Sequence, residues 1–291
     1  MNQTYIIATD SCSDLTNEQV SAMDIKIVPL SVEIKGEVFK HYPDERYLKI
    51  KTFYEDMRNK EVAITSLINV GQFIEFFEPF LKDGKDILYV GFSSALSGTV
   101  QSAHLAVESL KEEYPERKIV IVDSLSASMG QGLLVYYTYL EAQKGKTIEE
   151  VEAYLEANKL HLIHLFTVDD LGTLKRGGRL SGAQALLGSL LKVKPVLHVS
   201  DEGKLVPIKK ARGRRTSLET LVELMKERIE NASEQTIFIS HGDDLEDAKF
   251  TAELIQKEIG VKEIIFGFIG PIIGAHSGPG TIAVFFMGNQ R

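Results

Sequence analysis

The segment from Gly91 to Thr99 carries four hydroxyl side chains and two glycines in nine residues. An apolar run at residues 87–90 precedes it and a helical pattern begins at residue 100, so we predict a turn between a buried strand and a helix. Such a turn presents free backbone N–H groups and the positive end of a helix dipole, which favour an anion. The segment lacks the lysine of a phosphate-binding loop, so the anion that suits it is modest, such as one carboxylate.

A second pair of hydroxyls, Thr65 and Ser66, precedes Asn69, a residue type that commonly caps a helix. Hydroxyls in such positions often act only as caps and turn formers. Beside the turn at Ser97 and Gly98, however, two hydroxyls and a backbone N–H group would share one carboxylate without a formal positive charge. The candidate anion-binding residues are thus Thr65, Ser94, Ser97 and Gly98.

A third segment, residues 270–280, holds six glycines or prolines in eleven positions between two apolar runs. This composition predicts a shaped loop rather than a flexible one. His276 lies in the loop, and rigid glycine-rich loops are suited to positioning a functional group. The alternative is a surface histidine, or a hydrogen-bonded one, without a role in binding.

Two segments are strongly basic. Residues 174–181 include Arg176 and a glycine pair, which suits either the C-terminus of a helix or an anion contact at a cleft. Residues 209–215 include Arg212 and suit either a solvated basic loop or a docking site for an acidic partner or a phosphate.

The bulk composition excludes several classes of protein. A net charge of −8 argues against nucleic acid as the main partner. The single cysteine, Cys12, rules out an intrachain disulfide and a multi-cysteine metal site, and His241 has no second histidine at ligand spacing. No apolar run approaches the ~20 residues that span a bilayer, and no signal peptide is visible. We therefore expect a soluble, cytoplasmic protein without stable membrane insertion, metal or cofactor.

Short apolar runs alternate with helical patterns along the 291 residues, which is typical of βαβ units and a mostly parallel sheet. Asp10, Thr65, Ser93 and Asp123 each follow such a run, and functional residues gather at the carboxyl ends of parallel strands. The pattern restarts after a charged helix at residues 145–158. We therefore predict an α/β fold of two lobes, residues 1–160 and 161–291, with a ligand in the cleft between them.

Two further predicted helices bear on the site. Phenylalanines at positions 73, 76, 77 and 80 recur at helical spacing within residues 70–81, and they either pack in the core or line an apolar cavity. Residues 183–191 predict a second, apolar helix.

Taken in order, these motifs resemble the DegV family of bacterial fatty-acid-binding proteins. The segments that carry the resemblance are Asp10-Ser11, Thr65-Ser66, Phe92–Thr99, Val122–Ser124, Leu174–Arg179 and Ile269–Gly280. Each motif is weak by itself, but their order and spacing are specific, and they span nearly the whole chain.

The resemblance implies a two-lobe α/β carrier without chemistry of its own, which holds one long-chain fatty acid such as palmitate in a buried tunnel. The family's carboxylate-binding threonine and serine correspond to Thr65 and Ser97 here. His276 and Arg176 are implied near the head group. Some members present the acyl chain to a separate fatty acid kinase, whose acyl phosphate product enters phospholipid synthesis. Arg212 is the candidate for contact with that kinase.

One departure from the family pattern concerns the tunnel mouth. The family's usual Thr-Ser-Gln-Pro-Ser is Thr65-Ser66-Leu67-Ile68-Asn69 here. The proline is lost and two aliphatic side chains are gained, so the resemblance leaves the preferred acyl chain open.

Two other functions are compatible with the same residues. A hydrolase or phosphotransferase would use Ser97 and His276, although the turn is not the G-x-S-x-G elbow of α/β-hydrolases. A regulator would sense lipid and bind another protein.

Overall fold

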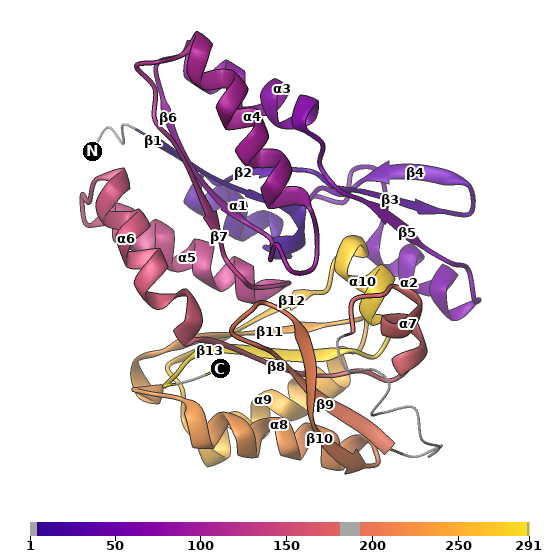
Figure 1. Cartoon of the computed structure of the whole chain (residues 1–291). Helices are drawn as coiled ribbons and strands as arrows, with labels where there is room; N and C mark the ends of the chain where they lie inside the picture. Colours follow the sequence, from indigo (N-terminus) through magenta and orange to yellow (C-terminus); the bar gives the residue numbers. More distant parts are fainter. Residues whose placement is uncertain (1–4, 181–192, 290) are drawn as a thin grey trace.

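The computed structural model describes residues 5–180, 193–289 and 291, so the helix expected over 183–191 lies outside the described residues. Within the described part, ten α-helices accompany three β-sheets (Figure 1). The predicted α/β class is therefore confirmed.

The first sheet has four parallel strands in the order β2-β1-β6-β7. Its strands are β1 (Tyr5–Asp10), β2 (Lys26–Val28), β6 (Asp86–Gly91) and β7 (Ile119–Asp123). The helices around it are α1 (Asn17–Met23), α3 (Val70–Lys82), α4 (Thr99–Glu113), α5 (Met129–Gln143) and α6 (Ile148–Asn158). Helices α3 and α4 pack together against β6 and β7, while α5 and α6 contact the sheet from its opposite side (Figure 1). The polar ends of β1, β6 and β7 meet at one edge, as predicted.

The second sheet has six strands of mixed direction in the order β10-β9-β8-β13-β11-β12. Its strands are β8 (Leu162–Thr167), β9 (Val193–Val199), β10 (Leu205–Arg212), β11 (Thr236–His241), β12 (Glu263–Phe268) and β13 (Ile282–Met287). Helices α8 (Arg214–Arg228) and α9 (Leu245–Glu258) cover one face, and α5 packs on the other (Figure 1). Helix α5 carries apolar residues on nearly every side, which explains why it is buried between the two sheets.

A small antiparallel sheet of the order β4-β3-β5 corrects one prediction. It comprises β3 (Ser31–Ile34), β4 (Glu37–Lys40) and β5 (Ile64–Ser66), with α2 (Ile50–Arg58) between β4 and β5 in the chain. Thr65 therefore lies within this separate sheet and not at the end of a parallel strand. Between β2 and β3 the chain passes through Pro29, a residue that cannot donate a ladder hydrogen bond.

Two segments predicted as loops are regular structure. Residues 271–277 form α10 (Pro271–Ser277), so the loop expected around His276 is wrong. Proline is well suited to the first helical position, and Gly278 ends the helix with a φ of +83°. The basic segment 209–215 forms the end of β10 and the start of α8. The other basic segment matches the helix alternative: α7 (Leu171–Arg176) ends at Gly177.

The buried apolar residues form two clusters. One runs from the four-stranded sheet across α5 to the six-stranded sheet, and the other lies under α8 and α9. Phe73 and Phe77 are fully buried against Tyr89 in the first cluster, so the core alternative holds for these two rings. Because the first cluster joins both halves of the chain, the boundary near residue 160 remains a prediction. No helix in the described residues is long and apolar enough to cross a membrane.

Candidate functional site

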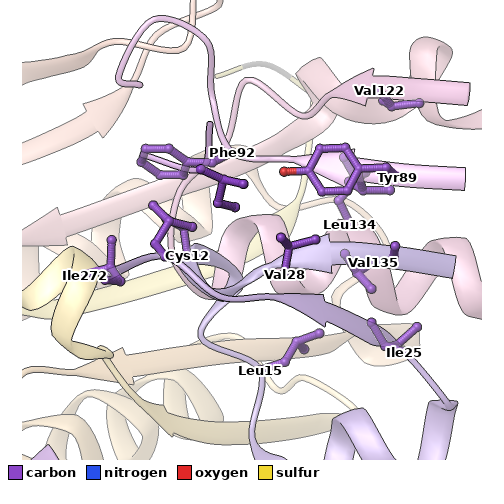
Figure 2. Close-up of a cluster of buried hydrophobic side chains, with 14 of the residues drawn as sticks. Cys12, Leu15, Ile25, Val28, Tyr89, Phe92, Val122, Leu134, Val135 and Ile272 are labelled. Carbon is purple, nitrogen blue, oxygen red and sulfur yellow. The ribbon is translucent and has the colours of Figure 1, made fainter. Parts of the chain in front are cut away.

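Mostly apolar side chains from both halves of the chain line a cavity near the four-stranded and six-stranded sheets. The apolar part of its wall comprises Cys12, Leu30, Leu67, Phe92, Leu96, Phe166, Leu174, Val199, Leu205, Ile269, Ile272, Ile273, Ala283 and Phe285, with Ala127. Figure 2 shows three of these, Cys12, Phe92 and Ile272, which come from three distant segments of the chain. In the same view the Tyr89 hydroxyl points toward the loop that carries Cys12, where it donates to Asp10 Oδ2 over 2.7 Å.

Paired side chains of β13 and β8 form one part of the cavity wall. Alternate side chains of a strand share a face, so Ala283 and Phe285 of β13 lie on the cavity side, and they pair with Phe166 and His164 of β8. The rings of His164 and Phe285 meet edge to face with centroids 5.4 Å apart. Burial, followed by the Arg291 charge, lowers the pKa of His164 well below its ordinary value, so this inner part of the wall is uncharged at neutral pH.

Thr65 and His276 form the polar end of the cavity. Thr65 Oγ1 lies 2.8 Å from His276 Nε2. Both residues, together with Arg179, also line a wider and more polar hollow at the surface. These three residues therefore stand where the apolar cavity meets the solvent-facing hollow.

The imidazole of His276 is neutral at physiological pH. Burial lowers its pKa to about 4, and the charge of Arg179 acts in the same direction. The ring packs against Gly177, where a Cβ atom would stand only 2.3 Å from His276 Nδ1. That Nδ1 atom is buried and has no hydrogen-bond partner in the described part of the chain. The glycine after α7 thus leaves room for the histidine.

Ser97 and Gly98 line the same cavity at the start of α4. Ser97 Oγ lies 2.9 Å from Thr99 Oγ1 and accepts the Thr99 N–H over 3.3 Å. Gly98 is the N-cap residue and has no side chain with which to cap the helix. First-turn N–H groups are therefore oriented toward the region around Ser97. Leu67 lies over this point, with its Cδ2 atom 3.4 Å from where a Cβ of Gly98 would be.

Three other predicted site residues lie outside the cavity wall formed by the described residues. Ser94 is exposed, and its backbone N–H donates to Asp123 Oδ1 over 3.2 Å. Arg176 lines the outer hollow and donates to Thr173 Oγ1 over 3.0 Å. Arg212 is exposed at the end of β10.

Arg179 lines the site although the sequence patterns do not single it out. It belongs to the same basic segment as Arg176, but it lines both the cavity and the outer hollow. Its Nε donates to Leu96 O over 3.4 Å and one terminal nitrogen donates to Gly177 O over 2.5 Å. Spacing alone could not distinguish the two arginines, because the turn after α7 determines which one faces the cavity.

Asp14 is a second unpredicted feature, buried between the two sheets. Its carboxyl oxygens accept from Ser128 Oγ over 2.5 Å and from the Gly270 N–H over 3.0 Å, both uncharged donors. Burial raises the pKa of Asp14 to about 8. No group of three or more His, Cys, Asp or Glu residues in the described ranges is arranged to hold a metal ion.

Sequence comparison identifies relatives over the whole chain. The family model described as "Uncharacterised protein, DegV family" matches residues 4–289. A DegV domain-containing protein of Clostridium perfringens is 45% identical over 287 residues, which cover 99% of this chain and 98% of the relative. A DegV domain-containing protein of Listeria monocytogenes is 34% identical over 288 residues, with 98% of each chain covered.

Solved structures give the same result. A DegV family protein of Thermus thermophilus, described by its fatty acid binding, superposes with a TM-score of 0.88 at 29% identity, covering 98% of this chain and 100% of that one. DegV of Bacillus subtilis, described as a fatty acid binding protein, superposes with a TM-score of 0.84 at 30% identity, covering 99% and 100%. The fold, the cavity and these relatives together show that the chain belongs to the DegV family.

Proposed function

We propose that this protein binds one long-chain fatty acid, with its acyl chain in the apolar cavity and its carboxylate at the polar end. The observation that carries the proposal is the Thr65–His276 pair at one end of a largely apolar wall. The fatty acid binding described for the Thermus thermophilus and Bacillus subtilis relatives supports it.

The energetics of such a ligand fit this arrangement. About fifteen methylenes at ~0.8 kcal/mol each give roughly 12 kcal/mol of drive for burying the acyl chain. A buried carboxylate is costly unless it is hydrogen-bonded. Thr65, Ser97, neutral His276 and the first turn of α4 provide hydrogen-bonding groups for it. Arg179 adds a positive charge at the junction with the outer hollow.

The outer hollow suggests how the bound acid would be used. It opens next to Thr65 and His276, so it leaves a route from solvent to the carboxylate. We propose that a separate fatty acid kinase reaches the carboxylate through this hollow and forms an acyl phosphate for phospholipid synthesis. Arg176 in the hollow and exposed Arg212 are the proposed contacts for that kinase.

The geometry around His276 favours a carrier over a hydrolase. A nucleophile–base pair needs a third group that orients the base. His276 Nδ1, where that group would bind, packs against Gly177 and has no partner in the described residues. We expect the purified protein to show no turnover of p-nitrophenyl esters or nucleotides, and turnover abolished by His276→Ala would contradict the carrier function.

Two ligands of equal chain length test the proposal directly. The delipidated protein is titrated with palmitate and with hexadecanol, which lacks the carboxylate. We expect palmitate to bind at one site and hexadecanol to bind at least tenfold more weakly. Equal binding of the two would show that the polar end does not recognise the carboxylate, and binding of neither would contradict the proposal.

A further inference from the structure

Arg291 is a half-buried side chain outside the cavity wall that joins several segments of the described chain. All five of its N–H donors have an acceptor, and each acceptor is uncharged. Nε donates to Leu162 O over 3.0 Å, one terminal nitrogen to Leu125 O and Ser200 O over 2.7 and 3.1 Å, and the other to Ser126 Oγ and Lys159 O over 3.0 and 2.8 Å. A guanidinium group has a rigid fork of five donors, so no other side chain could join these segments in the same way.

The segments that Arg291 joins carry part of the cavity wall. Leu125 and Ser126 precede Ala127 and Ser128, which line the cavity at the start of α5. Ser200 belongs to the turn between β9 and β10, a turn flanked by two further lining residues, at positions 199 and 205. Arg291 therefore connects the loop after β7 with the β9–β10 turn, two segments next to which cavity-lining residues lie.

The backbone of the loop after β7 has an unfavourable conformation that needs hydrogen bonds to hold it. Leu125 and Ser128 both have positive φ, +48° and +54°, a conformation that side chains other than glycine seldom adopt. The intervening Ala127 N–H donates to His164 Nε2 over 3.3 Å. The hydrogen bonds to Arg291 and His164 thus hold a strained loop in place.

A second contact joins the same turn to the four-stranded sheet. Ser93 Oγ donates to Gly203 O over 2.9 Å. Gly203 has a φ of +77°, and a Cβ there would lie 2.2 Å from Ser93 Oγ and 3.2 Å from Leu125 Cα. The β9–β10 turn is therefore packed closely against both loops.

We propose that Arg291 is a positioning residue for the ligand cavity: by tying the loop after β7 to the β9–β10 turn, it holds the inner wall closed and slows release of the bound acyl chain. This inference rests on the proposed function. Arg291 is not one of the described residues that line the cavity, so its effect passes through Ala127, Ser128 and the turn flanked by residues 199 and 205.

Release kinetics test this role. The protein is loaded with the fluorescent fatty acid cis-parinaric acid, and its release is followed after addition of excess oleate. We expect Arg291→Ala to release the probe at least tenfold faster than the unaltered protein. Arg291→Lys should be intermediate, because an ammonium group keeps the charge but cannot reach all five acceptors. Leu221→Ala is the matched control, since Leu221 is fully buried in the second core cluster, away from the cavity.

The outcomes separate positioning from general destabilisation. A release rate of Arg291→Ala within twofold of the unaltered protein would overturn the inference, as would equal acceleration by Leu221→Ala. Amide hydrogen exchange of the ligand-free proteins gives an independent readout. Residues 125–128 and 200–203 should exchange faster in Arg291→Ala but not in Leu221→Ala, and unchanged exchange there would overturn the inference. If the unaltered protein bound no fatty acid, the proposed function would fail while this exchange test still decided the role of Arg291.

Discussion

Thr65 Oγ1 and His276 Nε2 lie 2.8 Å apart, although 211 residues separate them in the chain. Thr65 stands on β5 of the small antiparallel sheet, and His276 stands in the last turn of α10. Helix α10 contacts both β5 and β3, and this packing holds the two side chains together. The polar end of the cavity is thus built where α10 packs on the small antiparallel sheet.

Removing both hydroxyls should abolish fatty acid binding while leaving the fold intact. A hydrogen bond to a charged group contributes about 1.5–3 kcal/mol, or roughly tenfold to hundredfold in affinity. We therefore expect the double variant Thr65→Ala with Ser97→Ala to bind palmitate at least a hundredfold more weakly, as measured by titration. Ser94→Ala is the matched control, because this serine is exposed outside the cavity wall. Full fatty acid occupancy in the double variant would show that the site is assigned wrongly.

Gly177→Ala should displace His276 without straining the backbone. Gly177 has a φ of −69°, which alanine adopts readily, yet its Cβ would stand 2.3 Å from His276 Nδ1. We expect palmitate affinity to fall about tenfold or more, with little change in thermal stability. Gly71→Ala, in the first turn of α3, is the control because its Cβ would meet only an ordinary contact at 3.4 Å. Equal palmitate affinity of the two variants would show that Gly177 is not needed to position His276.

Asp14 should make the protein less stable as the pH rises. Its pKa is raised from 3.8 to about 8, so the folded state keeps a proton that the unfolded chain releases. Its contribution to the free energy of unfolding therefore declines from about pH 4 until about pH 8, by about 2 kcal/mol between pH 6.5 and pH 8. Buried His41 and half-buried His276, whose pKa values are lowered, affect stability below pH 6.5 instead.

Urea unfolding at pH 6.5 and pH 8 measures this effect. Asp14→Asn should lose about 2 kcal/mol less than the unaltered protein between the two pH values, because asparagine has no proton to release. Glu75→Gln, at an exposed position of α3, is the control and should follow the unaltered protein. Identical pH dependence of all three proteins would contradict a protonated Asp14.

Arg212 should affect the kinase and not the ligand. Its side chain is exposed at the end of β10, outside the described cavity wall. We expect Arg212→Ala to bind palmitate as the unaltered protein does but to support at least tenfold less acyl phosphate formation by an added fatty acid kinase. Lys226→Ala, a cation in the last turn of α8, is the control. Unchanged acyl phosphate formation with Arg212→Ala would show that Arg212 is not part of the kinase docking surface.

The parallel sheet and its polar strand ends follow from the sequence because apolar periodicity reflects burial directly. The runs before Asp10, Ser93 and Asp123 are β1, β6 and β7, and Asn69 caps α3 through the Gln72 N–H as its residue type suggests. The strand at Thr65 is antiparallel and not the parallel strand that the sequence predicts, because three-residue strands such as β5 carry too little periodicity to reveal their partner.

Tertiary packing determines several features of the site that local sequence patterns do not indicate. The glycines and prolines of residues 270–280 indicate a rigid segment equally well as a loop or as a short helix, and packing of α10 on α2, α7 and β5 selects the helix. Arg179, Asp14 and Arg291 owe their roles to neighbours far away in the chain. Residue type alone, arginine or aspartate in a chain that holds several of each, gives no signal of these contacts.

The most direct test of the central claim is mass spectrometry of an organic extract from the purified, denatured protein. Fatty acid binding predicts a near-stoichiometric long-chain fatty acid in the extract, and its length and unsaturation would report the shape of the cavity. An empty extract, followed by failure of the refolded or freshly purified protein to bind added palmitate or oleate, would contradict the account and return attention to the enzyme alternative at Ser97 and His276.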